Sequence, residues 1–142
     1  MKEKMKLLFI CGSNSCRSAM AEFITNTKYG DVAEALSAGV DGNSERYGIN
    51  TKTREIMKSM DIDISTHKPR SLVKMEGDFY IAISFTNSEP MEFFDKNYPN
   101  IHAEKLMYVP VDDPKHKKME KYQVVVAEIE DIIKRILDPT EL

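Results

Sequence analysis

Four short apolar runs along the chain predict β-strands. They lie at residues 6–10, 33–38, 78–84 and 105–109. The first and third runs consist mainly of consecutive apolar residues, which is typical of parallel strands that helices cover on both faces. The first run stops abruptly at a stretch rich in Ser, Asn and Gly, so we expect the central strand of a sheet to end there in a loop.

Between and after these runs, apolar residues recur at a helical spacing. The spacing predicts helices over 18–24, from Thr51 through Met60, over 89–95 and over 118–137. In the last helix, the apolar positions expected on one face are Val124, Val125, Ile129, Ile132, Ile133 and Ile136. The remaining segments are predicted as a polar loop over 40–50, an extended link over 61–65 and a helical turn over 72–75.

Strands that alternate with helices predict an α/β fold. We expect a doubly wound, four-stranded parallel sheet with helices on both faces and an oxyanion-binding loop after the first strand. A length of 142 residues suits one compact domain, and the sequence contains neither an internal repeat nor a linker. We therefore expect a single domain over residues 1–142.

The charge balance and the hydropathy exclude two classes of partner. With 20 Lys and Arg against 23 Asp and Glu, the formal net charge is -3, so the chain lacks the basic footprint of a nucleic-acid-binding protein. No apolar run approaches the roughly 18 residues that span a bilayer, and the start of the chain lacks the apolar core of a signal peptide. We expect no nucleic-acid or membrane partner and a cytoplasmic location.

The loop after the first strand carries the candidate chemistry. It reads Cys11-Gly12-Ser13-Asn14-Ser15-Cys16-Arg17-Ser18. Ligands of open α/β sheets bind beyond the carboxyl ends of the strands, and this loop also leads into a helix start, where free N–H groups favour an anion. Arg17 can grip two oxygens of a tetrahedral oxyanion, and the same positive surroundings favour the thiolate form of Cys11.

The spacing Cys-x5-Arg distinguishes this loop from other phosphate-binding loops. The lysine-containing Walker sequence is absent, and a cysteine and an arginine are present instead. By itself the spacing is short enough to occur by chance, with Cys11 an inert buried residue. Its position between an apolar strand and an amphipathic helix favours a nucleophile that faces a bound oxyanion.

Residues 9–22, which include this motif, resemble the opening of the low-molecular-weight protein tyrosine phosphatases and of the arsenate reductases that share their fold. Three further segments agree with that family in order and spacing: Ser37-Ala38-Gly39, Ile62-Asp63-Ile64-Ser65 with His67 and Arg70, and Asp112-Asp113-Pro114. The resemblance frames nearly the whole chain.

The resemblance implies covalent catalysis without a metal or a cofactor. Cys11 would attack phosphorus to give a cysteinyl-phosphate, while Arg17 and the loop amides hold the other oxygens. The substrate-binding positions would be Gly12, Ser13, Asn14, Ser15, Cys16 and Ser18. Asn14 would hold the loop in its curl with support from Ser37, and Ser18 would steady the thiolate; a plain helix N-cap is a compatible role for Ser18.

Two other positions keep alternative roles. The resemblance assigns Asp113 as the acid that protonates the leaving group and then as the base that activates water, although Asp-Pro is also an ordinary turn dipeptide. Cys16 would either form a reversible disulfide with Cys11 or serve as a small buried hydrophobe. The histidines form no triad and no metal pattern, so surface or structural roles are expected for His67, His102 and His116.

Two departures from the family pattern bear on the reaction. Thioredoxin-coupled arsenate reductases carry two more cysteines after the third strand, whereas this chain reads Ser84-Phe85-Thr86-Asn87-Ser88 there. Tyrosine phosphatases of this fold carry aromatic residues just after Asp-Pro, whereas Lys115 and His116 follow here. Tyr47 could supply one aromatic wall of the site.

The leading hypothesis is therefore a phosphomonoesterase that acts on protein phosphotyrosine or another aryl phosphate. Its partners would be a phosphorylated protein or a small aryl phosphate, and oxyanions such as phosphate would inhibit it. One alternative is an arsenate reductase regenerated by an external thiol. The other is a non-catalytic module that binds an oxyanion or a phosphopeptide, although binding alone needs neither Cys11 nor Asp113.

Overall fold

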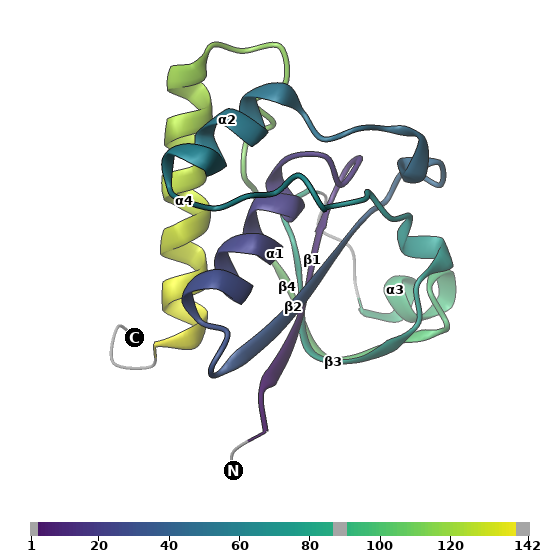
Figure 1. Ribbon diagram of the computed structural model, residues 1–142. Helices are drawn as coiled ribbons and strands as arrows, with labels where there is room; N and C mark the ends of the chain where they lie inside the picture. Colours follow the sequence, from purple (N-terminus) through teal and green to yellow (C-terminus); the bar gives the residue numbers. More distant parts are fainter. Residues whose placement is uncertain (1–2, 87–90, 139–142) are drawn as a thin grey trace.

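The sheet has four parallel strands in the order β2-β1-β3-β4. The computed structural model describes residues 3–86 and 91–138. The elements are β1 (Met5–Cys11), α1 (Arg17–Lys28), β2 (Ala33–Gly39), η1 (Ser44–Arg46), α2 (Thr51–Ser59), η2 (Leu72–Lys74), β3 (Gly77–Ser84), α3 (Met91–Asn97), β4 (Ile101–Tyr108) and α4 (Met119–Leu137). Figure 1 shows α1, α2 and α4 on one side of the sheet and α3 on the other. The predicted α/β fold, with helices flanking a four-stranded parallel sheet, is confirmed.

The central strand β1 is buried on both faces. Leu7 and Phe9 belong to the apolar cluster under α1 and α4, whereas Leu8 and Ile10 belong to a second cluster on the face of α3. This division follows from the two-residue period of a strand, which points successive side chains to opposite faces. It explains why this run contains almost no polar residue.

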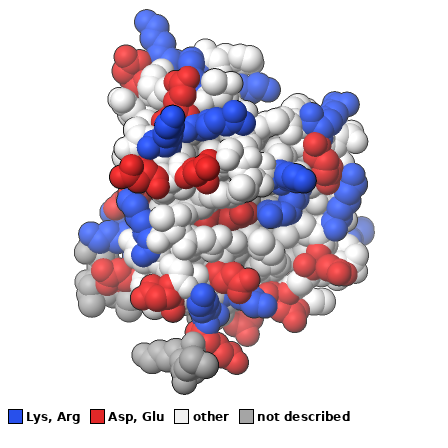
Figure 2. Space-filling model, viewed as in Figure 1, with Lys and Arg blue, Asp and Glu red and all other residues white. Residues whose placement is uncertain are grey.

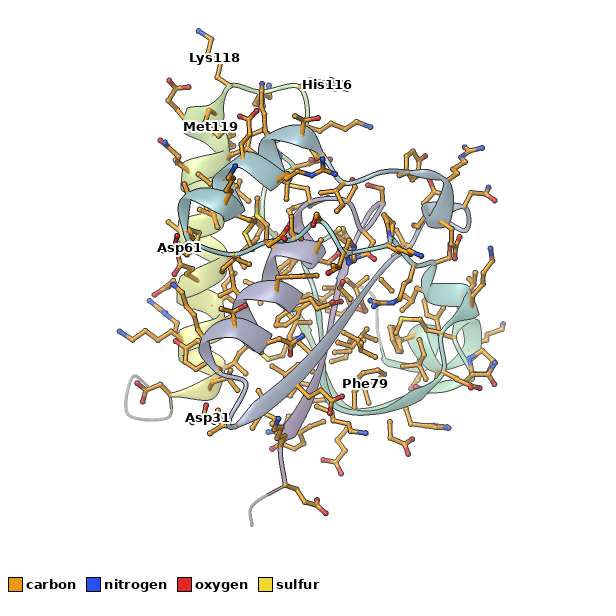
Figure 3. All side chains as sticks on the ribbon, viewed as in Figure 1. Asp31, Asp61, Phe79, His116, Lys118 and Met119 are labelled. Carbon is orange, nitrogen blue, oxygen red and sulfur yellow. The ribbon has the colours of Figure 1, made fainter. Side chains whose placement is uncertain are left out.

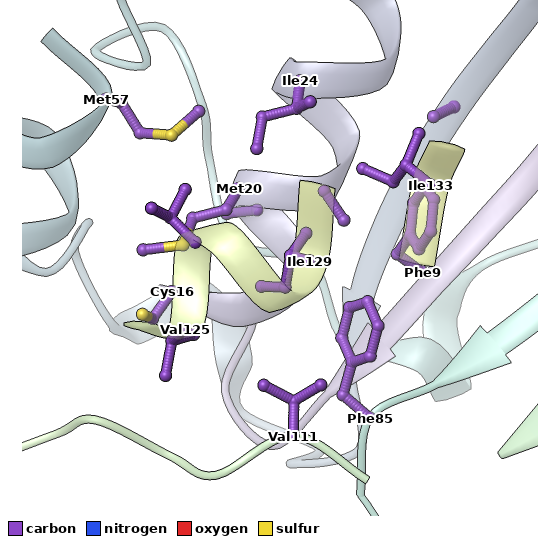
Figure 4. Close-up of a cluster of buried hydrophobic side chains, with 14 of the residues drawn as sticks. Phe9, Cys16, Met20, Ile24, Met57, Phe85, Val111, Val125, Ile129 and Ile133 are labelled. Carbon is purple, nitrogen blue, oxygen red and sulfur yellow. The ribbon is translucent and has the colours of Figure 1, made fainter. Parts of the chain in front are cut away.

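Helix α4 packs against α1 through one apolar stripe, part of which Figure 4 shows. The buried residues of α4 are Tyr122, Val125, Val126, Ile129 and Ile133. The stripe predicted from the sequence is wrong at Val124, which is 50% exposed, because the buried positions follow a spacing of three or four residues from Tyr122. Ile132 and Ile136 are partly buried and pack at the edge of the cluster.

Several predicted elements differ from the structure in their bounds, and α1 extends to Lys28 rather than to residue 24. Strand β4 begins at Ile101 rather than at residue 105; it lies at the edge of the sheet, and its exposed polar residues interrupt the apolar run. Helix α3 spans Met91–Asn97 rather than 89–95, and residues 89 and 90 lie outside the described part of the chain. The polar loop over 40–50 contains the short helix η1.

Charged side chains of both signs are interspersed over the face shown in Figure 2. This distribution agrees with the nearly balanced composition of the chain. Among the helices of the described residues, none combines the length and the apolar character needed to cross a membrane.

Candidate active site

The loop between β1 and α1 lies at the carboxyl end of the central strand. Cys11 is the last residue of β1 and pairs with Gly39 of β2, and α1 begins at Arg17. The Cys11 side chain is buried, and its Sγ lies 2.8 Å from Ser18 Oγ. The Ser18 backbone N–H also points at this sulfur, at 3.5 Å. The first turn of α1 therefore brings a hydroxyl group and a backbone N–H to Cys11.

Ser18 does not cap the helix. The N-cap position is Cys16, which makes no side-chain capping bond, and Ser18 is already inside the first turn. The Ser18 hydroxyl forms hydrogen bonds with Cys11 and with Asn14. The N-cap alternative for Ser18 is therefore wrong, and its contact with the sulfur is the relevant one.

Asn14 fixes the curl of the loop. Its φ is 62°, in the left-handed region that few non-glycine residues adopt. Its Nδ2 donates to Ser18 Oγ and to Ser37 Oγ, each at 2.8 Å. Its Oδ1 accepts from Arg70 N, and its carbonyl oxygen lies 2.9 Å from His67 Nε2. Because a carbonyl only accepts, His67 must carry its proton on Nε2.

The remaining loop residues contact one another and the segments beside them. Ser13 Oγ lies 2.7 Å from Ser15 Oγ, and Ser15 O accepts a hydrogen bond from Asn50 N at 3.2 Å. Gly12 O accepts from Asp41 N at 2.9 Å. The loop is thus held from the side by the segment that follows β2.

Arg17 bridges the loop and the two other strand ends. Its Nη1 donates to Val111 O at 2.8 Å and to Phe85 O at 3.3 Å, which orients the guanidinium plane. Its Nη2 lies 3.8 Å from Asp113 Oδ2. The same nitrogen would be 3.8 Å from a Cβ placed on Gly12. One edge of the guanidinium is therefore anchored, and the other lies between the loop and Asp113.

Of the two adjacent aspartates, Asp113 is the one that faces Arg17. Its Oδ1 accepts from Lys115 N at 3.0 Å, and its side chain is half exposed. Asp112 instead forms an ion pair with Lys121 at 2.8 Å, and the hydrogen bond from Lys121 lowers the pKa of Asp112. His116 and Lys118 follow in the same loop before α4 (Figure 3).

Gly39 allows β2 to approach the loop closely. A Cβ on Gly39 would lie 2.7 Å from Gly12 O and 2.8 Å from Ser13 C, and it would also overlap Ser44 Oγ. The Gly39 N–H donates to Arg70 O at 2.7 Å. The sequence interpretation cited Gly39 in a family segment but missed this steric requirement.

The comparisons with known proteins identify the family. Residues 6–142 match the model of the low molecular weight phosphotyrosine protein phosphatases. The chain belongs to this phosphatase family. An arsenate reductase of Staphylococcus saprophyticus is 32% identical over 139 residues, which cover 96% of this chain and 98% of that protein.

Solved structures of other proteins share the fold. A low molecular weight protein tyrosine phosphatase from T. tengcongensis superposes with a TM-score of 0.77 at 28% identity, covering 96% of this chain and 99% of the other. An arginine phosphatase from Geobacillus stearothermophilus gives a TM-score of 0.74 at 21% identity, covering 96% of this chain and 93% of the other. Proteins named for different reactions thus share this fold.

Cys16 is the second cysteine of this loop. Both thiols are free. Cys16 packs into the apolar cluster under α4, and burial raises its pKa to about 12. The structure agrees with the prediction of a small buried hydrophobe and does not test the reversible disulfide.

Three polar residues around the loop were missed as site residues. A surface or a structural role was expected for His67, and because its side chain is buried only the structural role applies. Burial lowers the pKa of His67 below 6.5. Glu22 and Arg70 form an ion pair at 2.9 Å directly behind Ser37. His67 and Arg70 stand in the quoted family segments, but spacing alone does not reveal that both contact Asn14.

No metal site is present in the described residues. Across 3–86 and 91–138, no three His, Cys, Asp or Glu side chains are grouped closely enough to hold a metal ion. The loop offers a thiol, a guanidinium and a curled run of amides, and Asp113 adds a carboxylate from the segment before α4. This arrangement is suited to holding a tetrahedral oxyanion against a nucleophilic sulfur.

Proposed function

We propose that the protein hydrolyses phosphomonoesters, with protein phosphotyrosine or another aryl phosphate as the substrate. The observation that carries the proposal is the position of Asp113, whose Oδ2 lies 3.8 Å from Arg17 Nη2. Arg17 follows the loop that begins at Cys11, the last residue of β1. A binding site for an oxyanion needs no acid at that point. A phosphatase needs one, because the leaving oxygen must acquire a proton.

The proposed reaction has two chemical steps. In the first, the Cys11 thiolate attacks phosphorus, the ester P–O bond breaks, and Asp113 protonates the leaving oxygen. Arg17 and the N–H groups of residues 12–17 stabilise the charge on the equatorial oxygens. In the second, a water attacks phosphorus and gives its proton to Asp113, while the S–P bond breaks and the thiolate returns. Each step uses only groups of this chain and water.

Features at the mouth of the site favour an aryl group on the substrate. Tyr47 donates its hydroxyl hydrogen to Asp41 Oδ2 at 2.8 Å, and Asp41 is itself bonded to Gly12 O. The Tyr47 ring therefore lies close to the loop, with Lys115 Nζ 6.0 Å from the ring centroid. A phenyl ring can pack on Tyr47, and the cation beside it favours an anionic neighbourhood on a phosphorylated protein.

A second candidate reaction is arsenate reduction by an external thiol. It is favoured by the 32% identical relative, which is named an arsenate reductase. In that reaction the Cys11 sulfur would bond to arsenic while one arsenate oxygen leaves as water. A small-molecule thiol would then attack the Cys11 sulfur, so that the S–As bond breaks, its electron pair leaves with arsenic as arsenite, and a mixed disulfide remains. A second thiol would then regenerate Cys11. The chain has only two cysteines, and Cys16 is buried with a raised pKa, so the electrons must come from outside.

We also propose that residues 1–142 act as one domain in the cytoplasm, where a reducing environment would keep the Cys11 thiol free. The remaining alternative is a module that binds a phosphopeptide without turning it over. This alternative would be supported if the folded protein bound an oxyanion but hydrolysed no phosphomonoester.

One experiment separates the three functions. Hydrolysis of p-nitrophenyl phosphate and dithiothreitol-driven reduction of arsenate are measured side by side, without added metal, for the wild type and for Cys11→Ser. We expect phosphate release that Cys11→Ser abolishes, and slower or no arsenite formation. Arsenite formation without phosphate release would support the reductase. Loss of both reactions, with phosphate still bound, would support the binding module.

A further inference from the structure

A partly buried ion pair, with Glu22 buried and Arg70 partly exposed, lies behind the Cys11 loop and takes no part in the proposed chemistry. The Glu22 side chain, on α1, is 8% exposed, and its Oε1 accepts from Arg70 Nη1 at 2.9 Å. The same oxygen accepts from Ser37 Oγ at 2.8 Å. A carboxylate is costly to bury without partners, so these contacts call for an explanation beyond packing.

Asn14 sets the direction of the hydrogen bonds that lead from this pair to the site. Its Oδ1 accepts from the Arg70 backbone N–H at 2.9 Å, and that N–H can only donate. The other end of the amide is therefore the Nδ2 group, which gives one hydrogen to Ser37 Oγ and one to Ser18 Oγ. Both serine hydroxyls receive a hydrogen from Asn14.

Each hydroxyl has one hydrogen of its own left to donate. Ser37 directs its hydrogen to Glu22 Oε1. Ser18 has Cys11 Sγ as its neighbour at 2.8 Å. A hydroxyl that already accepts from Asn14 is thereby oriented as a donor to the sulfur, which stabilises the thiolate over the thiol.

Arg70 holds three members of this network at once. Besides Glu22 and Asn14, its Nη1 contacts Ser37 O at 3.1 Å. Its own carbonyl accepts from Gly39 N at 2.7 Å, at the end of β2. The guanidinium also neutralises Glu22, which keeps that oxygen available as an acceptor for Ser37.

We propose that Glu22 and Arg70 are positioning residues, which orient Ser37, Asn14 and Ser18 so that Ser18 donates its hydroxyl hydrogen to the Cys11 sulfur. Neither residue touches the substrate. The inference rests on the proposed function only in taking Cys11 as the nucleophile, and it applies equally to attack on phosphorus or on arsenic.

The test measures the sulfur itself. Alkylation of Cys11 by iodoacetamide is followed from pH 4 to 9 by mass spectrometry, for the wild type, Glu22→Gln, Arg70→Gln and Ser18→Ala. The matched controls are Glu34→Gln and Arg54→Gln, which change the same residue types at exposed positions. The titratable groups around the loop, Cys16, Arg17, His67 and Asp113, are unchanged in every variant.

We expect the midpoint of the alkylation profile to rise by at least about half a pH unit in Glu22→Gln, Arg70→Gln and Ser18→Ala, and to stay in place in both controls. If Glu22 acts through Ser18, adding Glu22→Gln to Ser18→Ala should move the midpoint no further. With p-nitrophenyl phosphate, kcat should fall more than KM changes, because the nucleophile and not the binding surface is altered.

A purely structural role would lower the unfolding temperature and leave the midpoint unchanged, and that result in Glu22→Gln would overturn the proposal. If Glu22→Gln does not fold, Arg70→Gln decides the question, since the Arg70 side chain is 38% exposed and its replacement is less disruptive. The alkylation assay needs no substrate. Absence of phosphatase activity in the wild type would therefore contradict the proposed function. A shifted midpoint of the alkylation profile in the Glu22 and Arg70 variants would still support this inference.

Discussion

Asp113 Oδ2 lies 3.8 Å from Arg17 Nη2, whereas the neighbouring Asp112 turns to Lys121. This difference between adjacent carboxylates separates a candidate acid from a surface ion pair. It arises because Asp113 accepts from Lys115 N, which closes a tight turn and points the second oxygen toward Arg17. The two side chains are therefore a natural matched pair for mutation.

Asp113→Asn should affect substrates according to their leaving groups. Removal of a general acid slows the proton-dependent step by about 100-fold or more, and alkyl phosphates need the proton far more than p-nitrophenyl phosphate does. Asp112→Asn should leave both rates within a few-fold of the wild type. Steady-state kinetics on both substrates measures this, and an equal loss on the two would remove Asp113 from the acid role.

Gly39→Ala should destabilise the protein and disorder the Cys11 loop. A Cβ there would lie 2.7 Å from Gly12 O, which is backbone and has little room to move. We expect a loss of about 1–3 kcal/mol in the free energy of unfolding and loss of phosphate binding. Gly42→Ala is the control, because a Cβ there meets nothing within 4 Å. Urea unfolding that shows equal stability for the two variants would contradict the steric account.

Cys16 should be unreactive in the folded protein. Burial raises its pKa to about 12, so only about one molecule in ten thousand would carry the thiolate at pH 8. Iodoacetate should modify Cys11 selectively, inorganic phosphate should slow that modification, and Cys11→Ser should take up almost no reagent. Peptide mapping by mass spectrometry provides the readout. Modification of Cys16 at a rate similar to that of Cys11 would be inconsistent with this environment.

His67 should make stability depend on pH in the weakly acidic range. Burial lowers its pKa from 6.5 in the folded protein, an effect that outweighs its hydrogen bond to Asn14 and the nearby Glu22 charge. The unfolded chain then binds a proton that the folded one does not. Stability is fully present above pH 6.5 and is lost as the pH falls toward the lowered folded-state pKa.

Urea unfolding at pH 7.5 and at pH 5.5 measures this loss. His67→Gln keeps a donor for the Asn14 carbonyl but cannot titrate, so its stability should change less between the two pH values than that of the wild type. His102→Gln, at an exposed position, should behave as the wild type does. An identical loss of stability in His67→Gln and the wild type would rule out His67 as the source.

Much of the fold follows from the sequence because its signals are local. The apolar run of β1 and the helical stripe of α4 indicated a parallel sheet with helices, and the family resemblance covered nearly the whole chain. Strand β4 was shortened in the prediction because exposed polar residues of this edge strand interrupt its apolar run. Val124 was misplaced because four adjacent apolar residues in α4 obscure which ones face inward.

The site was predicted at the level of its loop but not of its supports. Cys11, Arg17 and Asp113 come from motifs, and the structure brings them to one end of the sheet. His67 and Arg70 contact Asn14, and Glu22 contacts Ser37 and Arg70. These contacts depend on how segments far apart in sequence pack, and no local pattern encodes that. Gly39 was missed for the same reason, since its constraint is the backbone of another segment.

The central claim is that Cys11 forms a covalent phosphoryl intermediate. It is tested most directly by acid-quenching the enzyme during turnover of p-nitrophenyl phosphate and mapping its peptides by mass spectrometry. The account predicts one added phosphoryl group on the peptide that contains Cys11, enriched in Asp113→Asn when hydrolysis of the intermediate is slowed, and absent in Cys11→Ser. Undiminished turnover by Cys11→Ser, or a phosphoryl group on another residue, would contradict it.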